Sequence, residues 1–250
     1  FRISTERISE IFEEAQNDGR NVLLASETSE IFRIYGIKNP KTYLAKSASE
    51  TEQLSSKIGF PLVMKVVSPD IIHKTDCGGV MLNIKNEQQA KDAFLRIINN
   101  VHKYGPLNAK IYGVELQEMV ETSNFQKSTQ MILGMTKDPQ WGPLLMVGTG
   151  GIYTNFLKDV SFDLAYKYDK DDALRQLSKT KIYSILKGVR GEPKSDIDAI
   201  LNVLIRISQL VHDFPEIVEL DINPLLVFEE NPDHDNYSAV DIKITITSRK

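Results

Sequence analysis

Residues 216–228 read EIVELDINPLLVF, and residues 237–246 read YSAVDIKITI. Both stretches are rich in β-branched residues and alternate between polar and apolar side chains, which predicts two strands. In the first stretch, alternation gives two sets of side chains on opposite faces: a polar set of Glu219, Asp221 and Asn223, and a core-facing set of Val218, Leu220 and Ile222.

The polar face of these two strands has the composition of a metal site. The second stretch contributes Asp241, Lys243 and Thr245. If the strands pair, oxygens of Asp221, Asn223 and Asp241 converge on one small volume. A few hard oxygen ligands suit Mg²⁺, which keeps waters and shares its other positions with phosphates. A polar strand face in solvent fits the same spacing and is the alternative.

A second candidate region, SPDIIHKTDCGG at residues 68–79, lies between two apolar strand candidates, LVMKVV and VMLNI. Its glycines let the backbone approach a ligand, and Lys74 offers a cation to phosphate. His73 suits a general base, a metal ligand or a nucleophile that accepts phosphoryl groups, whereas an exposed histidine without a role is the alternative. Lys65, inside the first strand, requires an anionic ligand or an ion pair.

The rest of the chain predicts an α+β protein, because consecutive strands outnumber strand–helix–strand alternations. We expect a first helix with Ile8, Ile11 and Phe12 on one face, a second capped by Ser29, and a later one opened by Asn86. The cluster GTGG at residues 148–151 indicates a tight turn, followed by a strand at residues 152–157. A boundary near residues 104–107 separates two lobes.

Composition excludes several classes of protein. The chain has 250 residues and a net charge of −4, with no basic run, which argues against a nucleic-acid partner. The single cysteine, Cys77, cannot form an internal disulfide and indicates a reducing compartment. No apolar run approaches the roughly 20 residues needed to cross a bilayer, so a cytoplasmic protein is expected. The start at Phe1 is consistent with a piece of a longer chain.

Six dispersed segments together resemble the β-subunit ATP-grasp domain of ADP-forming acetyl-CoA synthetases, and they occur in the family's order. They are SPDIIHKTDCGGV, GVELQEMVE, MILGMTKDPQWGP, GTGGIYTNFLKDVSFDLA, LKGVRGEP and DFPEIVELDINPL. The resemblance implies an ATP-grasp fold in which two lobes, residues 1–105 and 106–250, close on a nucleotide. It also implies a reaction in which a free acid, CoA and ATP are interconverted with acyl-CoA, ADP and phosphate.

The resemblance further implies Mg²⁺, ATP or ADP as substrate, and a CoA-binding α subunit or fused α domain, in a hetero-oligomer or fused-chain dimer. It suggests a role for each matching residue. His73 is similar to the histidine that carries phosphate, and Asp221 to the acid that orients a phosphohistidine. Lys65 is similar to the lysine that contacts nucleotide phosphate, and Glu118 to the residue beside the adenine pocket. Asn223 and Asp241 are similar to the metal-ligand pair.

The sequence departs from the family's pattern at two places near the expected nucleotide region. Gln130 replaces a usual glutamate, and Thr154-Asn155 replaces a usual Val-Glu pair. Both changes remove a carboxylate and bear on nucleotide preference and rate. Two other classes share much of the resemblance: a regulatory ATP-grasp-like domain fused to a lysine acetyltransferase, and a carboxylate–amine ligase.

Overall fold

The computed structural model describes residues 5–71, 73–151, 154–232 and 236–248. The chain forms two compact units. The small unit comprises Leu24–Ser29 and Pro40–Val120, and the large unit comprises Phe1–Leu23, Glu30–Asn39 and Glu121–Lys250. Helix α2, Ala25–Ile34, therefore contributes residues to both units.

These two units do not correspond to the two lobes expected from the sequence, residues 1–105 and 106–250. Residues 1–23 join the large unit, and the Leu23 amide donates to the Ile244 carbonyl there at 3.0 Å. Residues 106–120 join the small unit, because the strand they contain pairs with two strands of the small sheet. Strand pairing and helix docking, rather than position along the chain, decide which unit a segment belongs to.

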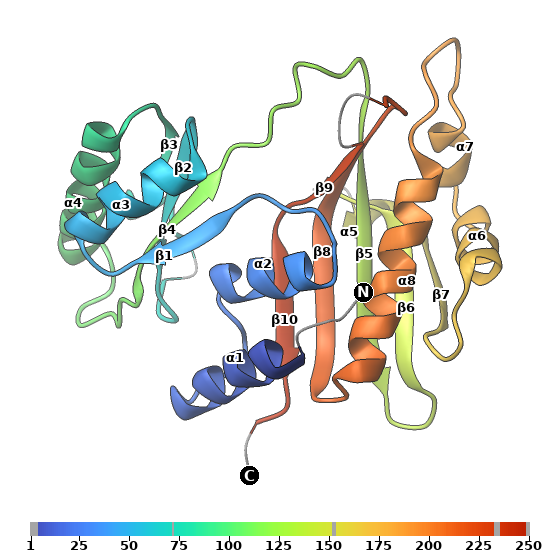
Figure 1. Ribbon diagram of the computed structural model, residues 1–250, viewed down its shortest axis with the longest axis horizontal. Helices are drawn as coiled ribbons and strands as arrows, with labels where there is room; N and C mark the ends of the chain where they lie inside the picture. Colours follow the sequence, from blue (N-terminus) through green and yellow to red (C-terminus); the bar gives the residue numbers. More distant parts are fainter. Residues whose placement is uncertain (1–4, 72, 152–153, 233–235, 249–250) are drawn as a thin grey trace. The chain divides into compact units, whose positions relative to one another are not determined.

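The small unit contains a four-stranded antiparallel sheet in the order β1-β4-β2-β3. Its elements are β1 (Thr42–Ala45), α3 (Ala48–Ile58), β2 (Leu62–Val67), β3 (Val80–Ile84), α4 (Glu87–Tyr104) and β4 (Gly113–Glu118). Helices α3 and α4 lie beside this sheet (Figure 1), and the buried Met64, Val66 and Leu116 share one core with residues of both helices. Asn86 caps α4 as predicted, since its side chain accepts from the Gln89 amide at 2.9 Å.

The large unit contains an antiparallel sheet in the order β10-β8-β5-β6-β7, with β9 paired to β8. Its strands are β5 (Ser128–Asp138), β6 (Gly142–Thr149), β7 (Val160–Leu164), β8 (Ile217–Phe228), β9 (Tyr237–Ala239) and β10 (Ile242–Ile246). Its helices, besides its share of α2, are α1 (Thr5–Asn17), α5 (Thr154–Leu157), α6 (Lys170–Ser178), α7 (Ile182–Leu186) and α8 (Ile197–Asp213).

Helix α8 crosses the large sheet (Figure 1), and its fully buried Leu204 and Ile207 share one core with Leu220 and Ile222 of β8. The predicted face of α1 enters the same core. Within the described residues, no helix is long and apolar enough to span a membrane.

Three sequence predictions about local structure were wrong. Helix α2 begins before Ser29, because Glu27 accepts from the Leu24 amide at 2.7 Å and starts the helix earlier; the Ser29 hydroxyl instead donates to the Pro40 carbonyl. Val218 is only half-buried, and Ile217 takes the inward position because the register with β10 shifts there.

The third error is the strand at residues 152–157. Residues 154–157 form α5, and residues 152 and 153 lie outside the described part of the chain. Phe156 is 85% exposed and Leu157 53%, so these two apolar side chains are not part of a core. The next strand along the chain is β7, Val160–Leu164, which pairs with β6 and begins eight residues after the start of the predicted strand.

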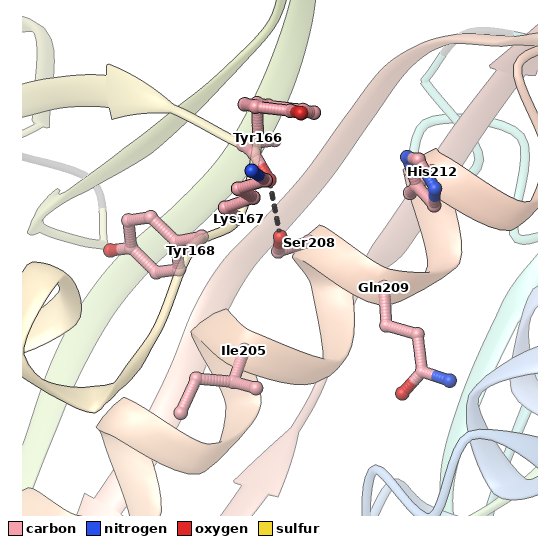
Figure 2. A pocket seen from close by; sticks show the side chains of 8 residues that line it. Tyr166, Lys167, Tyr168, Ile205, Ser208, Gln209 and His212 are labelled. Carbon is pink, nitrogen blue, oxygen red and sulfur yellow. Dashed lines mark hydrogen bonds between the residues drawn. The ribbon is translucent and has the colours of Figure 1, made fainter.

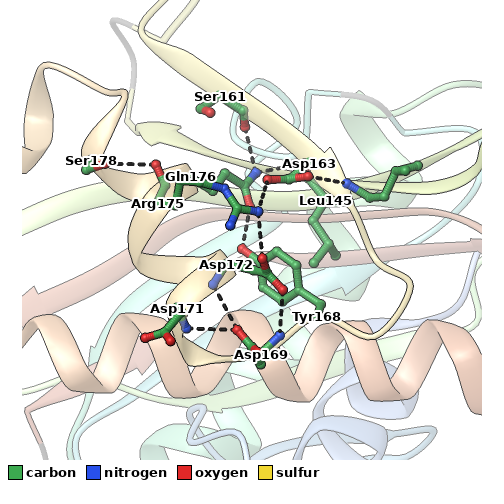
Figure 3. A network of polar contacts seen from close by, with 11 residues as sticks. Leu145, Ser161, Asp163, Tyr168, Asp169, Asp171, Asp172, Arg175, Gln176 and Ser178 are labelled. Carbon is green, nitrogen blue, oxygen red and sulfur yellow. Dashed lines mark hydrogen bonds and ion pairs between the residues drawn. The ribbon is translucent and has the colours of Figure 1, made fainter.

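A buried glutamine joins α6 to two strands of the large sheet (Figure 3). Gln176 is fully buried, and its amide nitrogen donates to the carbonyls of Leu145 on β6 and Ser161 on β7, each at 2.9 Å. Its amide oxygen accepts from the Tyr168 hydroxyl. All of these bonds are buried, where an unmet hydrogen-bonding group is costly.

We expect Gln176→Leu to lower the free energy of unfolding by about 2–4 kcal/mol, because two buried carbonyls lose their donor. Chemical denaturation followed by circular dichroism measures the change. Gln209→Leu, the same substitution at an exposed position of α8, should change stability by less than about 0.5 kcal/mol. Equal losses in the two variants would contradict a special role for Gln176.

Candidate functional site

The His73 segment is a compact turn between two strands of the small unit. His73 itself is exposed, and its carbonyl accepts from the Asp76 amide at 3.2 Å. The Lys74 carbonyl accepts from both the Gly79 amide at 2.8 Å and the Cys77 thiol at 3.3 Å. The side chain of Cys77 is buried, so the segment presents a histidine outward from a closed, anchored turn.

Lys65 projects from β2 with a defined partner. Its ammonium donates to the Gln117 side-chain oxygen on β4 at 3.1 Å, and the amide of Gln117 extends to the Thr42 hydroxyl at 3.4 Å. Glu115, which is 6% exposed, is the direct cross-strand neighbour of Lys65. Sequence reasoning missed Gln117 and Glu115, although their alternation along β4 puts both on the strand face that carries Lys65.

Glu118 ends β4 and is exposed. Its carboxylate accepts from the Lys41 amide at 3.2 Å, and its own amide donates to the Lys41 carbonyl at 3.0 Å. The residue therefore fixes the chain that enters β1.

In the large unit, β8 and β10 pair as predicted, with Lys243 opposite Asp221 and Thr245 opposite Glu219. Asn223 and Asp241 meet where β9 ends and β10 begins, since the Asn223 amide donates to the Asp241 carbonyl at 3.2 Å. Asp241 has a φ of 48° and is exposed, and its carboxylate has no hydrogen bond or ion pair within the described residues. It is available to a cation.

The glycine turn after β6 is tied to this junction. The Asn223 side-chain oxygen accepts from the Gly151 amide at 2.8 Å. Gly151 has a φ of 81°, and a Cβ there would lie 2.3 Å from the side-chain oxygen of Gln130. Gly148 and Thr149 of the predicted GTGG turn instead end β6. Gln130, Gly151 and Asn223 lie together, a contact that the sequence did not reveal.

Asp221 lies half-buried on β8. Its pKa is raised above the ordinary value for aspartate, first by burial and then by the nearby carboxylate of Glu219; Lys243 opposes the shift, and Asp241 adds to it. Glu219 in turn is held by Lys243 at 3.6 Å and by the Thr245 hydroxyl at 3.2 Å.

A small cavity of about 90 Å³ lies beside Asp221, lined also by Glu219, Thr136, Met146 and Phe162. Gly134 is the cross-strand neighbour of both Asp221 and Met146. It has no side chain to fill the space between them, and a Cβ there would lie 2.7 Å from the Leu220 carbonyl.

The predicted site residues fall into two groups. His73, Lys74, Lys65 and Glu118 belong to the small unit, and Gln130, Asp221, Asn223 and Asp241 to the large unit. No group of three or more His, Cys, Asp or Glu side chains with the geometry of a metal site occurs among the described residues. One carboxylate and one amide oxygen fit Mg²⁺, which binds through few protein ligands and takes others from phosphates and water.

None of these residues lines a larger pocket of about 510 Å³ in the large unit, between α8 and the segment that follows β7 (Figure 2). Its polar lining includes Lys167, Ser208, Gln209 and His212. The Ser208 hydroxyl is already used, since it donates to the Ala165 carbonyl at 2.7 Å.

Comparison with known proteins assigns the class. The chain belongs to the ATP-grasp domain family, whose model matches residues 14–246. It is 41% identical over 222 residues to the β subunit of acetate–CoA ligase [ADP-forming] I from Pyrococcus furiosus, an alignment that covers 89% of this chain and 92% of that subunit. It is also 43% identical over 230 residues to the 4-hydroxybutyrate–CoA ligase [ADP-forming] of Nitrosopumilus maritimus, covering 92% of this chain. The chain spans 32% of the length of that second relative.

Solved structures agree with the fold. The dinucleotide-forming acetyl-coenzyme A synthetase 1 of Ca. Korarchaeum cryptofilum, with its phosphohistidine segment phosphorylated and in a site I orientation, matches with a TM-score of 0.83 and 33% identity over 96% of this chain and 100% of that one. The same protein with coenzyme A and Mg-AMPPCP, its phosphohistidine segment pointing towards the nucleotide-binding site, matches with a TM-score of 0.78 and 31% identity, over the same shares of both chains.

Proposed function

We propose that this chain is the nucleotide-binding half of an ADP-forming acyl-CoA synthetase, which interconverts acid, CoA and ATP with acyl-CoA, ADP and phosphate. The observation that carries the proposal is His73, exposed on an anchored turn, in a chain that matches a β subunit over nearly its whole length. The Korarchaeum relative is described with a phosphohistidine segment in two orientations, which supports a reaction that proceeds through phosphohistidine.

In the nucleotide step, an imidazole nitrogen of His73 attacks the γ-phosphorus of ATP. The bond between that phosphorus and the β–γ bridging oxygen breaks, a phosphorus–nitrogen bond forms, and ADP leaves. The attacking nitrogen must be unprotonated for its lone pair to reach phosphorus. Transfer back to ADP reverses these bonds. Asp221 orients a phosphohistidine in this scheme, as the resemblance implies.

Phosphoryl transfer depends mainly on positioning and on neutralising phosphate charge. Lys65, held by Gln117, and Lys74 supply positive charge to the nucleotide phosphates. Asn223 and Asp241 hold Mg²⁺ together with those phosphates, and the ion neutralises charge on the transferred group. Glu118 lies beside the adenine, and Gln130 contacts the nucleotide where relatives generally use a glutamate.

The CoA and the acid belong to a partner in this proposal. Relatives occur both as β subunits and as longer single chains, so a CoA-binding α subunit or a fused α domain supplies the other half. The relatives act, by name, on acetate and on 4-hydroxybutyrate. We propose a small carboxylic acid as substrate and a hetero-oligomer or a dimer of fused chains as the assembly.

The isolated chain, given γ-labelled ATP and Mg²⁺, should acquire phosphate that is labile to acid and stable to base, the behaviour of a phosphohistidine. Acyl-CoA-dependent formation of ATP should appear only after the partner half is added. The label is followed by gel autoradiography after acid and base treatment. Turnover of acyl-CoA by the chain alone, or a base-labile label, would contradict the proposal.

A further inference from the structure

The His73 segment, residues 73–79, has one fixed end. Gly78 approaches helix α4 so closely that a Cβ on it would lie 2.7 Å from the side-chain nitrogen of Asn100. That nitrogen donates to the Gly78 carbonyl at 3.2 Å. Gly78 has a φ of 65°, a conformation that glycine adopts without strain. The contact therefore requires a glycine on the segment and an amide donor on α4.

The next residue secures the same end to the sheet. The Gly79 carbonyl accepts from the Val66 amide on β2 at 2.8 Å, and a Cβ on Gly79 would lie 2.6 Å from the Val66 side chain. The Gly79 amide donates to the Lys74 carbonyl, which closes the turn. Residues 74–79 thus form one hydrogen-bonded body attached at Gly78 and Gly79.

The chain ahead of this body is held at a different point. The Asp70 carboxylate accepts from the Lys110 amide at 2.7 Å, and the Asp70 amide donates to the Ser68 hydroxyl at 3.1 Å. Among the described residues, one backbone hydrogen bond, from the Asp76 amide to the His73 carbonyl at 3.2 Å, ties His73 to the closed turn. The position of the imidazole therefore depends on how firmly the turn is held at its far end.

We propose that Asn100 is a positioning residue for phosphoryl transfer: through Gly78 it holds the turn that carries His73 against α4 and sets where the imidazole lies. This inference rests on the proposed function of His73. Without the Asn100 donor the closed turn keeps its internal bonds but rocks on the Gly79 attachment. The imidazole then spends less time in line with the nucleotide, and small misplacements lower transfer rates steeply.

The experiment compares three variants of the full 250-residue chain. Asn100→Ala removes the donor, Asn100→Asp keeps the size of the side chain but replaces the donor with an acceptor, and Asn99→Ala is the matched control at the exposed neighbouring position of the same helix. Single-turnover labelling of His73 by Mg-ATP gives both the maximal rate and the half-saturating nucleotide concentration. Hydrogen exchange gives the protection of residues 73–79.

Both Asn100 variants should label about tenfold more slowly, the loss expected from one partly buried hydrogen bond of about 1.4 kcal/mol. Exchange in residues 73–79 should rise and the melting temperature should fall by a few degrees, while the half-saturating nucleotide concentration stays at the wild-type value. Asn99→Ala should behave as wild type. A merely structural loss would lower the nucleotide affinity and raise exchange outside residues 73–79 as well.

Wild-type labelling rates in both Asn100 variants would overturn the inference, as would an equal loss in Asn99→Ala. If the wild-type chain itself acquired no label on His73, the proposed function would fail, which is a separate result from failure of the Asn100 contact.

Discussion

His73→Asn should abolish both the acid-labile label from γ-labelled ATP and the acyl-CoA turnover measured with the partner half. Asparagine keeps a polar side chain of similar length but has no nitrogen able to attack phosphorus, so the covalent step is lost entirely. Mg-nucleotide binding should persist at near wild-type affinity, because the imidazole is exposed and is not part of the sheet that holds Lys65. Binding is measured by isothermal titration calorimetry.

His102→Asn is the control for this substitution, since His102 is exposed on α4. It should label and turn over as wild type. Full labelling of His73→Asn would show that a residue other than His73 is phosphorylated. Loss of labelling in both variants would indicate a general effect of removing a histidine.

Asp241→Asn should weaken Mg-nucleotide binding by about tenfold or more. The substitution removes a negative charge next to the cation, an attraction worth several kcal/mol at a partly exposed site, and each 1.4 kcal/mol is tenfold in affinity. The fold should survive, because the Asp241 side chain is exposed and the bond from Asn223 uses the backbone carbonyl. Titrations at several magnesium concentrations measure the effect, which should shrink when magnesium is withheld.

The matched control is Asp92→Asn, an exposed aspartate on α4 whose single hydrogen bond, from Gln88, an asparagine oxygen can also accept. It changes net charge equally and should leave binding unchanged. If Asp241→Asn retained both the affinity and the magnesium dependence of the wild type, Asp241 would not be a metal ligand.

The sequence predicted the strands correctly where the alternation of polar and apolar residues matches the burial of one face in a core. The strand LVMKVV has the predicted bounds. Alternation also predicts that Leu220 and Ile222 face the core, because a shift by one residue would turn them away from it. Strands β8 and β10 then pair, the condition on which the polar cluster depended. The strand predicted at residues 152–157 was wrong because local composition does not reveal whether a core is present. Phe156 has strand-like character and yet lies exposed in a short helix.

The site was less accessible to sequence reasoning than the fold. Motif resemblance assigned roles to Lys65 and Asn223, but their partners, Gln117 and Gly151, come from other strands and turns. Lys65 and Gln117 are 52 positions apart in the sequence, and Gly151 and Asn223 are 72 apart. No local sequence pattern encodes contacts of this kind. The Asn100 contact with Gly78 is of the same kind.

The discontinuity of the large unit constrains the order in which the chain can be assembled during synthesis. Apart from Leu24–Ser29, the small unit is one continuous stretch ending at Val120, so it can collapse on its own sheet as soon as that stretch has left the ribosome. The large unit must wait, because the amide of Leu23 bonds to Ile244, more than two hundred residues later. Until β10 is made, α1 has an apolar face without its final partner, and such long sequence separations slow folding. Until then, α1 is therefore the part of this unit most exposed to aggregation in a nascent chain.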